Sequence, residues 1–370
     1  MACSVVIAPD KFKGTLTSAR VAQHLATGLA AARPDVGTIE VPVADGGDGT
    51  VDAAIAAGYR RIGIGVRGPT GKAVSAAFAF DGTTAIIEAA QACGLTLLPD
   101  GELAPLTATS RGVGELILVA ARMKAKRIVL GLGGVACTDG GAGMVRALGG
   151  IGYDADHAEL HPGGEELNRL EELDLAGLKD LSAIEFIVAT DVDNPLLGPS
   201  GAAAVYGPQK GASPADVEVL EAGLTRWADV VGSDYRDSPG AGAAGGLGFA
   251  ALSFLAARVE PGISLLLDLL SFEDHLRDAQ LVITGEGKLD EQTLHGKAPA
   301  GVARAAAAHG VPVVAVAGVS TLSPEQLTAA GIERAYTLAD IEPDLATCLS
   351  APGPLLESLA ATIAANHLPS

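Results

Sequence analysis

Glycines and charged side chains are concentrated in residues 281–298, LVITGEGKLDEQTLHGKA. The segment starts with four apolar, β-prone residues, continues with glycines and charged residues, and runs into an Ala-rich stretch. This order predicts a strand, a loop and a helix, an arrangement with which α/β enzymes bind phosphate. Gly285 and Gly287 would let backbone N–H groups approach an anion. Lys288 and Lys297 would supply the positive charge, so the segment is a candidate nucleotide-binding loop.

Two carboxylates in the same segment indicate a metal ion. Glu286 and Asp290 would repel a phosphate group that bound there alone. They fit if Mg²⁺ lies between carboxylate and phosphate, because Mg²⁺ prefers oxygen ligands and is usually shared with a nucleotide. A solvated surface loop is the alternative for this segment considered by itself.

Four other segments combine glycine with Asp or Lys directly after a predicted strand. They are residues 8–17 (APDKFKGTLT), 43–52 (VADGGDGTVD), 131–144 (GLGGVACTDGGAGM) and 189–212 (ATDVDNPLLGPSGAAAVYGPQKGA). A single Asp-Gly pair usually marks a turn. Five such segments at the carboxyl ends of strands indicate a ligand site, because open α/β sheets bind ligands at that edge.

The spacing of apolar residues predicts the elements that position these segments. Val21, Leu25 and Leu29, for example, repeat every fourth residue on one helix face. The predicted strands are 4–8, 38–44, 60–66, 73–80, 84–89, 127–132, 184–189, 281–284 and 311–317. The predicted helices are 17–33, 49–57, 112–124, 141–148, 214–231, 245–257, 299–309 and 354–365. This alternation, with continuously apolar strands, predicts an α/β fold with a mostly parallel sheet.

Length and composition restrict the class of protein further. A chain of 370 residues suggests two domains, and Gly- and Pro-rich stretches make residues 67–280 less regular than the rest, so we place a second domain there. The net charge of −19 argues against a nucleic-acid partner, which needs a basic face. The four cysteines are far apart, and the chain has neither a signal-peptide pattern nor an apolar run long enough for a bilayer. We therefore expect a cytoplasmic protein with no membrane partner.

The motifs together closely resemble the type I glycerate kinases over nearly the whole chain. The matching stretches are IAPDKFKGTL, PVADGGDGTV, TSRGVGEL, GGVACTDGGAGM, DVDNPLLGPSGAA, YGPQKGA, GAGAAGGLG and ITGEGKLDEQTLHGK. The resemblance implies a flavodoxin-like domain built from residues 1–66 and 281–370, with a second α/β domain (67–280) inserted. It also implies an active site in the cleft between the domains. Lys11, Val135 and Thr138 depart from the family's pattern.

The resemblance implies a reaction as well. ATP would donate its γ-phosphoryl group to a hydroxyl of D-glycerate, with Mg²⁺ required. Similarity to bacterial members favours the 2-hydroxyl and 2-phosphoglycerate as product, and phosphorylation of the 3-hydroxyl is the alternative. The sequence does not predict an oligomeric state.

Phosphoryl transfer needs positioning, charge neutralisation and a base near the attacking hydroxyl, and we assign candidates to each role. The candidate catalytic residues are Asp191 as general base, Lys13 and Asp45. The candidate substrate-binding residues are Asp10, Arg111 and Lys210. The candidate nucleotide-binding residues are Gly133, Gly134, Gly285, Gly287, Lys288 and Lys297. The candidate metal ligands are Asp139, Glu286 and Asp290. A carboxylate can act as base or metal ligand, so these last three and Asp45 stay open for either role.

Arg111 is the candidate that would hold the carboxylate of glycerate. It combines a guanidinium fork with the start of a predicted helix, and both favour an anion. The alternative is an ordinary ion pair with Glu115, one helical turn further on.

Two other classes of function are consistent with parts of the sequence. Residues 131–136, GLGGVA, follow a predicted strand and match a dinucleotide-binding fingerprint, which would suit an NAD-dependent oxidoreductase of a small hydroxy acid. A binding or scaffold protein would also have Ala-rich helices and an acidic surface. A scaffold would scatter its Asp and Lys residues over helices, whereas here they gather with glycine at strand ends, so we predict an enzyme.

Overall fold

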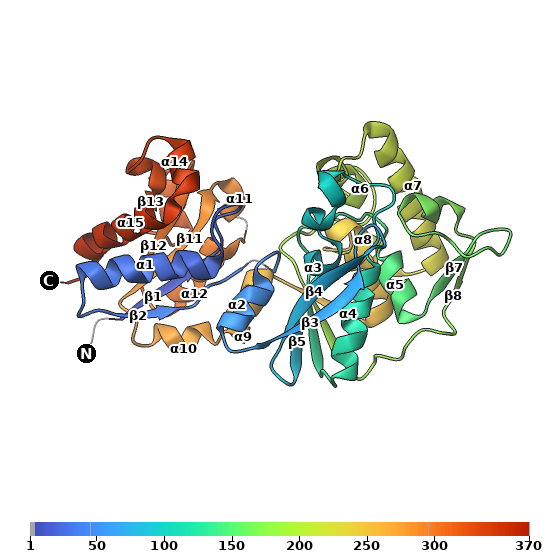
Figure 1. Ribbon diagram of the computed structural model, residues 1–370, viewed down its shortest axis with the longest axis horizontal. Helices are drawn as coiled ribbons and strands as arrows, with labels where there is room; N and C mark the ends of the chain where they lie inside the picture. Colours follow the sequence, from blue (N-terminus) through green and yellow to red (C-terminus); the bar gives the residue numbers. More distant parts are fainter. Residues whose placement is uncertain (1–3, 45, 295, 370) are drawn as a thin grey trace. The chain divides into compact units, whose positions relative to one another are not determined.

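The chain forms two compact units in the computed structural model, which describes residues 4–44, 46–294 and 296–369 (Figure 1). What we call the terminal unit consists of Met1–Asp45, Asp52–Gly58 and Pro261–Ser370. The middle unit consists of Gly46–Val51 and Tyr59–Glu260. The middle unit is thus inserted into the chain of the terminal unit.

The terminal unit contains a five-stranded parallel sheet in the order β13-β12-β11-β1-β2. Its strands are β1 (Ser4–Pro9), β2 (Gly37–Glu40), β11 (Leu281–Leu289), β12 (Val313–Ser320) and β13 (Arg334–Thr337). Numbered within this unit, the order across the sheet is 2-1-3-4-5, which is the flavodoxin-like order.

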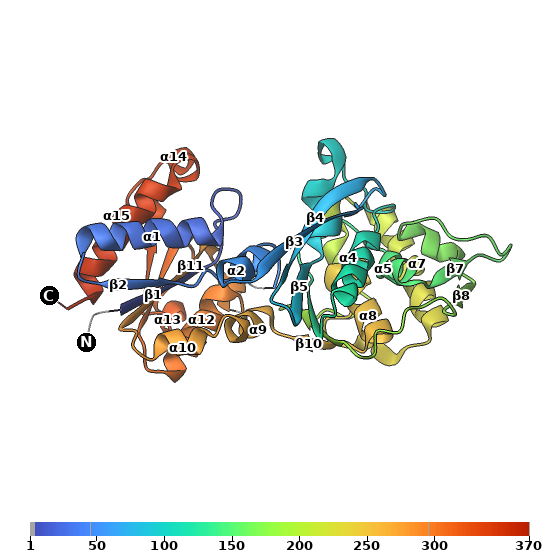
Figure 2. The ribbon, with the colours of Figure 1, turned by 60° about the horizontal axis from the view of Figure 1, so that its bottom comes forward.

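Helices cover both faces of this sheet (Figure 2). They are α1 (Ser18–Ala32), α9 (Gly262–Leu269), α10 (Phe272–Leu276), α11 (Glu291–Leu294), α12 (Ala298–Ala308), α13 (Pro324–Ala329), α14 (Leu345–Ser350) and α15 (Pro352–His367). Side chains of β1 alternate between the faces, as in any strand. Val5 and Ile7 are buried against α1 and α15, and Val6 and Ala8 against α9, α10 and α12.

Helix α1 shows how the sequence produces this packing. The Thr17 side chain accepts a hydrogen bond from the backbone N–H of Arg20 and so caps the helix. A methyl group at Gly28 would lie 2.3 Å from the carbonyl oxygen of Glu357, so α1 and α15 can meet this closely only because Gly28 has no side chain.

The middle unit contains a six-stranded sheet in the order β10-β9-β6-β5-β4-β3. Its strands are β3 (Arg60–Arg67), β4 (Ala73–Phe80), β5 (Thr84–Glu88), β6 (Arg127–Gly131), β9 (Glu185–Ala189) and β10 (Arg258–Glu260). Strands β5, β6, β9 and β10 are parallel, while β4 pairs antiparallel with β3 and β5. Strands β7 (Ile151–Tyr153) and β8 (Glu172–Asp174) form a separate antiparallel pair.

The helices of the middle unit complete its core. They are α3 (Ala90–Cys93), α4 (Arg111–Arg122), α5 (Ala142–Leu148), α6 (Ala202–Tyr206), α7 (Pro214–Val231) and α8 (Ala243–Leu255), and α2 (Thr50–Ala56) runs from this unit into the terminal one. Trp227 of α7, Phe249 of α8 and Phe78 of β4 are fully buried in one cluster. The β-strand and helical residues thus share one continuous hydrophobic core.

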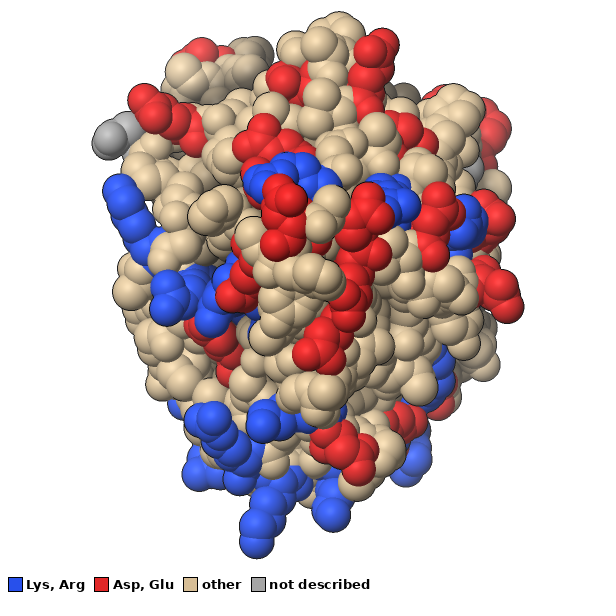
Figure 3. Space-filling model, turned by 90° about the vertical axis from the view of Figure 1, so that its right-hand side faces the viewer, with Lys and Arg blue, Asp and Glu red and all other residues tan. Residues whose placement is uncertain are grey.

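Most charged side chains of the middle unit lie at its surface. Arg127 and Arg258 both pair with Glu185, at 2.6 and 2.8 Å. Figure 3 shows Asp and Glu spread over the upper and central part of one face, with some Lys and Arg among them and more Lys and Arg toward its lower edge. Exposed ion pairs of this kind contribute little stability, at most about 1 kcal/mol each.

The predicted fold class is confirmed, with a flavodoxin-like domain and a second α/β domain inserted into it. The divisions between units fall at other residues than 66 and 281. Strand β3 pairs with β4 along its whole length and therefore belongs to the middle unit. Helices α9 and α10 belong to the terminal unit, because Ile263, Leu266 and Phe272 pack in its core.

The segment after Thr284 was predicted to be a loop, and this prediction is wrong. Strand β11 continues to Leu289, since Lys288 and Leu289 pair with Val319 and Ser320 of β12. Strand β2, in contrast, ends at Glu40 and not at Ala44. None of the helices in the described residues has both the length and the apolar character that crossing a bilayer requires.

Candidate active site

The carboxyl ends of β1 and β11 lie side by side in the terminal unit and bring four predicted residues together. The backbone N–H of Asp10 donates to the carbonyl oxygen of Gly285 at 2.7 Å. A methyl group at Gly287 would lie 3.3 Å from the backbone nitrogen of Lys13. Asp10 is buried and Lys13 is exposed, so this edge combines a held carboxylate with an ammonium group in solvent.

Two ion pairs follow along the same strand. Lys288 Nζ lies 3.3 Å from Asp290 Oδ2, and Lys297 Nζ lies 3.8 Å from Glu286 Oε2. Glu286 is buried, and its Oε1 accepts a 2.6 Å hydrogen bond from Thr293 Oγ1. We call residues 285–290, with Lys297, the β11 end.

The charges of the β11 end change the protonation of Asp290. Burial raises its pKa, but a hydrogen bond from Lys288, one from the backbone N–H of Gln292, and the charge of Lys297 outweigh burial, so the pKa lies below its ordinary value of 3.8. Asp290 is therefore ionised at neutral pH and available as an oxygen ligand.

The β11 end suits Mg²⁺ that is shared with a phosphate. Glu286 and Asp290 offer two carboxylates, and Mg²⁺ is usually bound through one or two carboxylates plus substrate oxygens. Among the described residues there is no group of three or more His, Cys, Asp or Glu side chains that could hold a metal ion. Protein ligands from these residues would therefore need completion by phosphate or water oxygens.

The glycines of β11 have packing roles. A methyl group at Gly285 would lie 2.1 Å from the carbonyl oxygen of Val316 in the neighbouring strand. Gly285 therefore permits the contact with β12, and its absent side chain does not leave open space for an anion.

In the middle unit, the carboxyl ends of β6 and β9 are neighbours. Gly131 is in register with Ala189, so the loop after β6 and Asp191 after β9 start from the same edge of the sheet. Asp191 is partly buried there. Asp45, the other predicted catalytic carboxylate, lies outside the described residues.

The space beside the first two glycines of the fingerprint at 131–136 is filled by another segment of the chain. Methyl groups at Gly131 and Gly133 would lie 2.2 Å from Gly46 O and 2.8 Å from Gly47 Cα. These two glycines let residues 46–51 pack on the edge of the sheet. Gly134, with φ +68°, serves the turn. The glycine pattern that suggested an NAD-dependent oxidoreductase is therefore explained by packing within the chain.

Glu88 is a buried carboxylate that the sequence analysis missed. It ends β5, is 2% exposed, and its Oε1 accepts a 2.6 Å hydrogen bond from the backbone N–H of Val51. It therefore helps to hold residues 46–51 on the sheet. The sequence signal that could have identified it is a Glu at the end of a buried strand, TAIIE.

The loop after β6, residues 132–141, is held from several sides, and we call it the β6 loop. Lys210 Nζ donates to Cys137 O at 2.5 Å and to Thr138 Oγ1 at 3.3 Å. Trp227 Nε1 donates to Gly140 O at 2.9 Å. Lys210 is only 3% exposed, and burial lowers its pKa below 10.5, although nearby Cys137, Cys93 and Asp139 partly offset this. Its observed contacts are those of a residue that supports the loop.

Asp139 sits at the centre of this region and is 1% exposed. Its Oδ2 accepts hydrogen bonds from Ser110 N, Ser110 Oγ and Gly143 N at 2.8, 2.9 and 3.2 Å. Its Oδ1 accepts one from Gly141 N at 3.1 Å. Its oxygens thus serve protein donors, which does not favour the predicted role as a metal ligand.

Arg111 begins α4 next to this carboxylate. Its Nε lies 3.4 Å from Glu115 Oε1, so the ion pair considered as an alternative is present. The Arg111 side chain is 30% exposed, and it also lines a cavity in the middle unit.

The cavity has a volume of about 50 Å³ and largely apolar walls. Its polar lining residues are Thr109, Arg111, Asp139, Arg146, Glu159 and His161. A water molecule needs roughly 10–15 Å³ of such space, so the cavity suits a molecule equivalent to a few waters. It is closer in size to a three-carbon acid than to a nucleotide.

Known proteins resemble this chain over almost its whole length. Residues 5–368 match the model of the glycerate kinase family. The "Glycerate kinase" of Bacillus subtilis (strain 168) is 44% identical over 342 residues, covering 90% of each chain. The "Glycerate 2-kinase" of Escherichia coli (strain K12) is 47% identical over 326 residues, covering 86% of this chain and 85% of that one.

A solved structure agrees with these relatives. A crystal structure from Salmonella typhimurium LT2 that bears the name glycerate kinase 2 superposes with a TM-score of 0.83 at 41% identity, and 99% of each chain is covered. The sequence resemblance to this family and the prediction of an enzyme are therefore confirmed. The chain belongs to the glycerate kinase family.

Proposed function

We propose that this enzyme transfers the γ-phosphoryl group of ATP to the 2-hydroxyl of D-glycerate, with Mg²⁺ required and 2-phosphoglycerate as product. The observation that carries the proposal is the pairing of two carboxylates with two lysines at the β11 end. Lysines neutralise phosphate charge, and carboxylates bind the Mg²⁺ that accompanies a nucleotide. The 47% identity to the Escherichia coli glycerate 2-kinase supports the 2-hydroxyl as acceptor.

The terminal unit would bind the phosphates of ATP. Lys288 and Lys297 would contact them from the β11 end, with Lys13 nearby on the neighbouring strand end. Glu286 and Asp290 would hold Mg²⁺, which supplies charge neutralisation on the transferring phosphoryl group. Asp10 is buried beside Gly285 and would orient the same strand ends.

The middle unit would bind glycerate. Arg111 would hold the carboxylate, because its guanidinium group and the N-terminus of α4 both favour an anion. The size of the adjacent cavity agrees with a three-carbon acid. Asp191, at the end of β9, would accept the proton of the attacking hydroxyl.

An assay of the purified enzyme with ATP, Mg²⁺ and D-glycerate tests the proposal, with the product identified by ³¹P NMR. We expect one phosphorylated product, coupled to the single proton on C2, that does not form without Mg²⁺. Coupling to two protons on C3 would show that the 3-hydroxyl is the acceptor. Product formation that is independent of Mg²⁺ would contradict the metal role of the β11 end.

A further inference from the structure

We propose that Asp139 and Ser110 are positioning residues for the substrate-binding Arg111. The inference rests on the proposed function, in which Arg111 holds the carboxylate of glycerate. Asp139 lines the cavity, but its oxygens bond to protein donors, so it and Ser110 would act through Arg111. They would fix the first turn of α4, from which Arg111 extends.

The carboxylate of Asp139 joins two helices at their first turns. Its hydrogen bonds come from Ser110, which precedes α4, and from Gly141 and Gly143 at the start of α5. A negative charge at the N-terminus of a helix is favourable, and a buried carboxylate is stable only when such donors surround it. The buried carboxylate of Asp139 thus connects the N-terminal ends of α4 and α5.

Ser110 forms the second part of the link. Its Oγ donates to Asp139 Oδ2 at 2.9 Å and accepts from the backbone N–H of Met144, in α5, at 3.0 Å. Ser110 therefore directly precedes α4, and its side chain bonds to the backbone of α5. Arg111 is the next residue, so a displacement of Ser110 moves the Cα atom of Arg111 directly.

The contact between the two helices leaves little room for adjustment. A methyl group at Gly143 would lie 2.2 Å from Thr109 Oγ1, 2.7 Å from Arg111 N and 2.8 Å from Asp139 Oδ2. The first turn of α5 therefore lies against the backbone of Arg111. Thr109, Arg111, Asp139 and Gly143 all line the cavity, so the link lies at the place where glycerate would bind.

The test compares four variants by their KM for glycerate, KM for ATP, Mg²⁺ requirement and melting temperature. In Asp139→Asn, an NH₂ group replaces one of two oxygens that accept N–H bonds. It then faces Gly141 N at the Oδ1 position, or Ser110 N and Gly143 N at the Oδ2 position, so the start of α4 or of α5 must move. We expect the KM for glycerate to rise about tenfold, because small displacements of a binding group are costly. In Ser110→Ala the loss of the two hydrogen bonds of Oγ predicts a rise of about threefold. Neither variant should change the Mg²⁺ requirement. Arg111→Lys is the reference and should raise the KM for glycerate at least as much.

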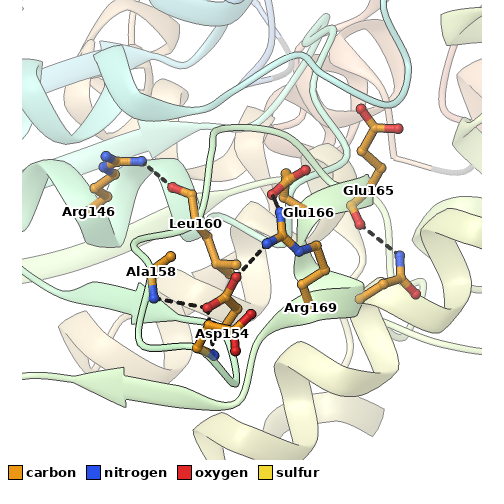
Figure 4. A network of polar contacts seen from close by, with 9 residues as sticks. Arg146, Asp154, Ala158, Leu160, Glu165, Glu166 and Arg169 are labelled. Carbon is orange, nitrogen blue, oxygen red and sulfur yellow. Dashed lines mark hydrogen bonds and ion pairs between the residues drawn. The ribbon is translucent and has the colours of Figure 1, made fainter.

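Asp154 provides a matched control in the same unit (Figure 4). It is also a buried carboxylate, it accepts hydrogen bonds from Asp156 N and Ala158 N at 3.0 and 2.9 Å, and it pairs with Arg169. Asp154→Asn should lower the melting temperature in the same way as Asp139→Asn. Its KM for glycerate should rise less than that of Asp139→Asn, because Asp154 holds the loop after β7, which brings Glu159 and His161 to the cavity, and makes no bond to α4.

The outcomes separate the inference from the function on which it rests. A higher Mg²⁺ requirement in Asp139→Asn, with an unchanged KM for glycerate, would make Asp139 a metal ligand and overturn the inference. A lower melting temperature alone would reduce its role to stability. If Arg111→Lys leaves the KM for glycerate unchanged, the proposed role of Arg111 fails, and a defect in Asp139→Asn then has another cause. If Asp139→Asn does not fold, Ser110→Ala decides by the same criteria.

Discussion

The β11 end and the β6 loop look alike in sequence but differ in what their side chains contact. Both combine glycines with carboxylates at or beyond the carboxyl end of a parallel strand. At the β11 end, Lys288 and Asp290 form an ion pair at the surface. In the β6 loop, Asp139 is buried and accepts bonds only from groups that also build the surrounding helices and turns. The same residue types thus form a partly exposed ion pair in one segment and a buried structural link in the other.

Removing the carboxylates of the β11 end should have the largest effect on the reaction. We expect the double variant Glu286→Gln/Asp290→Asn to lower kcat/KM at 1 mM Mg²⁺ about 100-fold, or about 2.7 kcal/mol. Activity should recover partly as Mg²⁺ is raised, which a titration of the rate with Mg²⁺ would measure. A loss that no concentration of Mg²⁺ reverses would argue against these residues as metal ligands.

A glycine of the β6 strand should matter for stability. In Gly131→Ala the added methyl group would lie 2.2 Å from Gly46 O, a backbone atom that must move. We expect a loss of about 2 kcal/mol in the free energy of unfolding, measured with urea. Gly63→Ala is the control, because its methyl group meets no atom within 4 Å. Equal losses in both variants would mean that the contact with Gly46 is not needed.

Lys210 links the β6 loop to the pH dependence of stability. Burial lowers the pKa of Lys210 in the folded protein, so the unfolded state binds the proton more tightly. Folding must therefore overcome a penalty while Lys210 is charged, and this penalty decreases as pH rises from the folded pKa toward 10.5. Relative to Lys210→Met, the wild type should therefore gain stability as the pH rises from 7 to 10, measured by urea unfolding of both proteins. A constant difference across this range would contradict the lowered pKa.

Lys288 should have the smallest effect on stability. Its side chain is 58% exposed, and its ion pair with Asp290 is open to solvent. Lys288→Ala should change the free energy of unfolding by less than about 0.5 kcal/mol, while the KM for ATP rises several-fold. Thermal unfolding and initial rates at varied ATP would measure the two quantities. A large loss of stability with an unchanged KM for ATP would show that Lys288 has a structural role, like Lys210 in the β6 loop.

Elements with a strong local pattern were predicted well. Helix α7 begins at Pro214 and ends at Val231 as predicted, because Ser213 caps it and Gly232 ends it in a left-handed turn. Strand β4 also has its predicted bounds. The second half of β11 was missed, because the letters GEGKL have no apolar alternation and the strand depends on pairing with β12.

The same local signals indicated where the candidate site lies, but they did not predict which residues contact one another there. The sequence predicted that five polar segments follow strands, although residues 285–289 prove to be part of β11, and the parallel sheets place neighbouring strand ends together. It did not show that Gly131 and Gly133 face residues 46–51, nor that Glu88 holds that segment. Such contacts join residues that are tens of positions apart, and no local pattern encodes them.

The sequence by itself determined the family and the α/β class, because these depend on residue types and on their order along the chain. Only the tertiary structure decided which charged residues face inward. Asp139 and Asp290 are equivalent in a list of carboxylates, but one is surrounded by N–H donors and the other lies beside a lysine at the surface. The physical reason is that burial and hydrogen-bond partners control what a carboxylate can do, and both arise only when distant segments pack together.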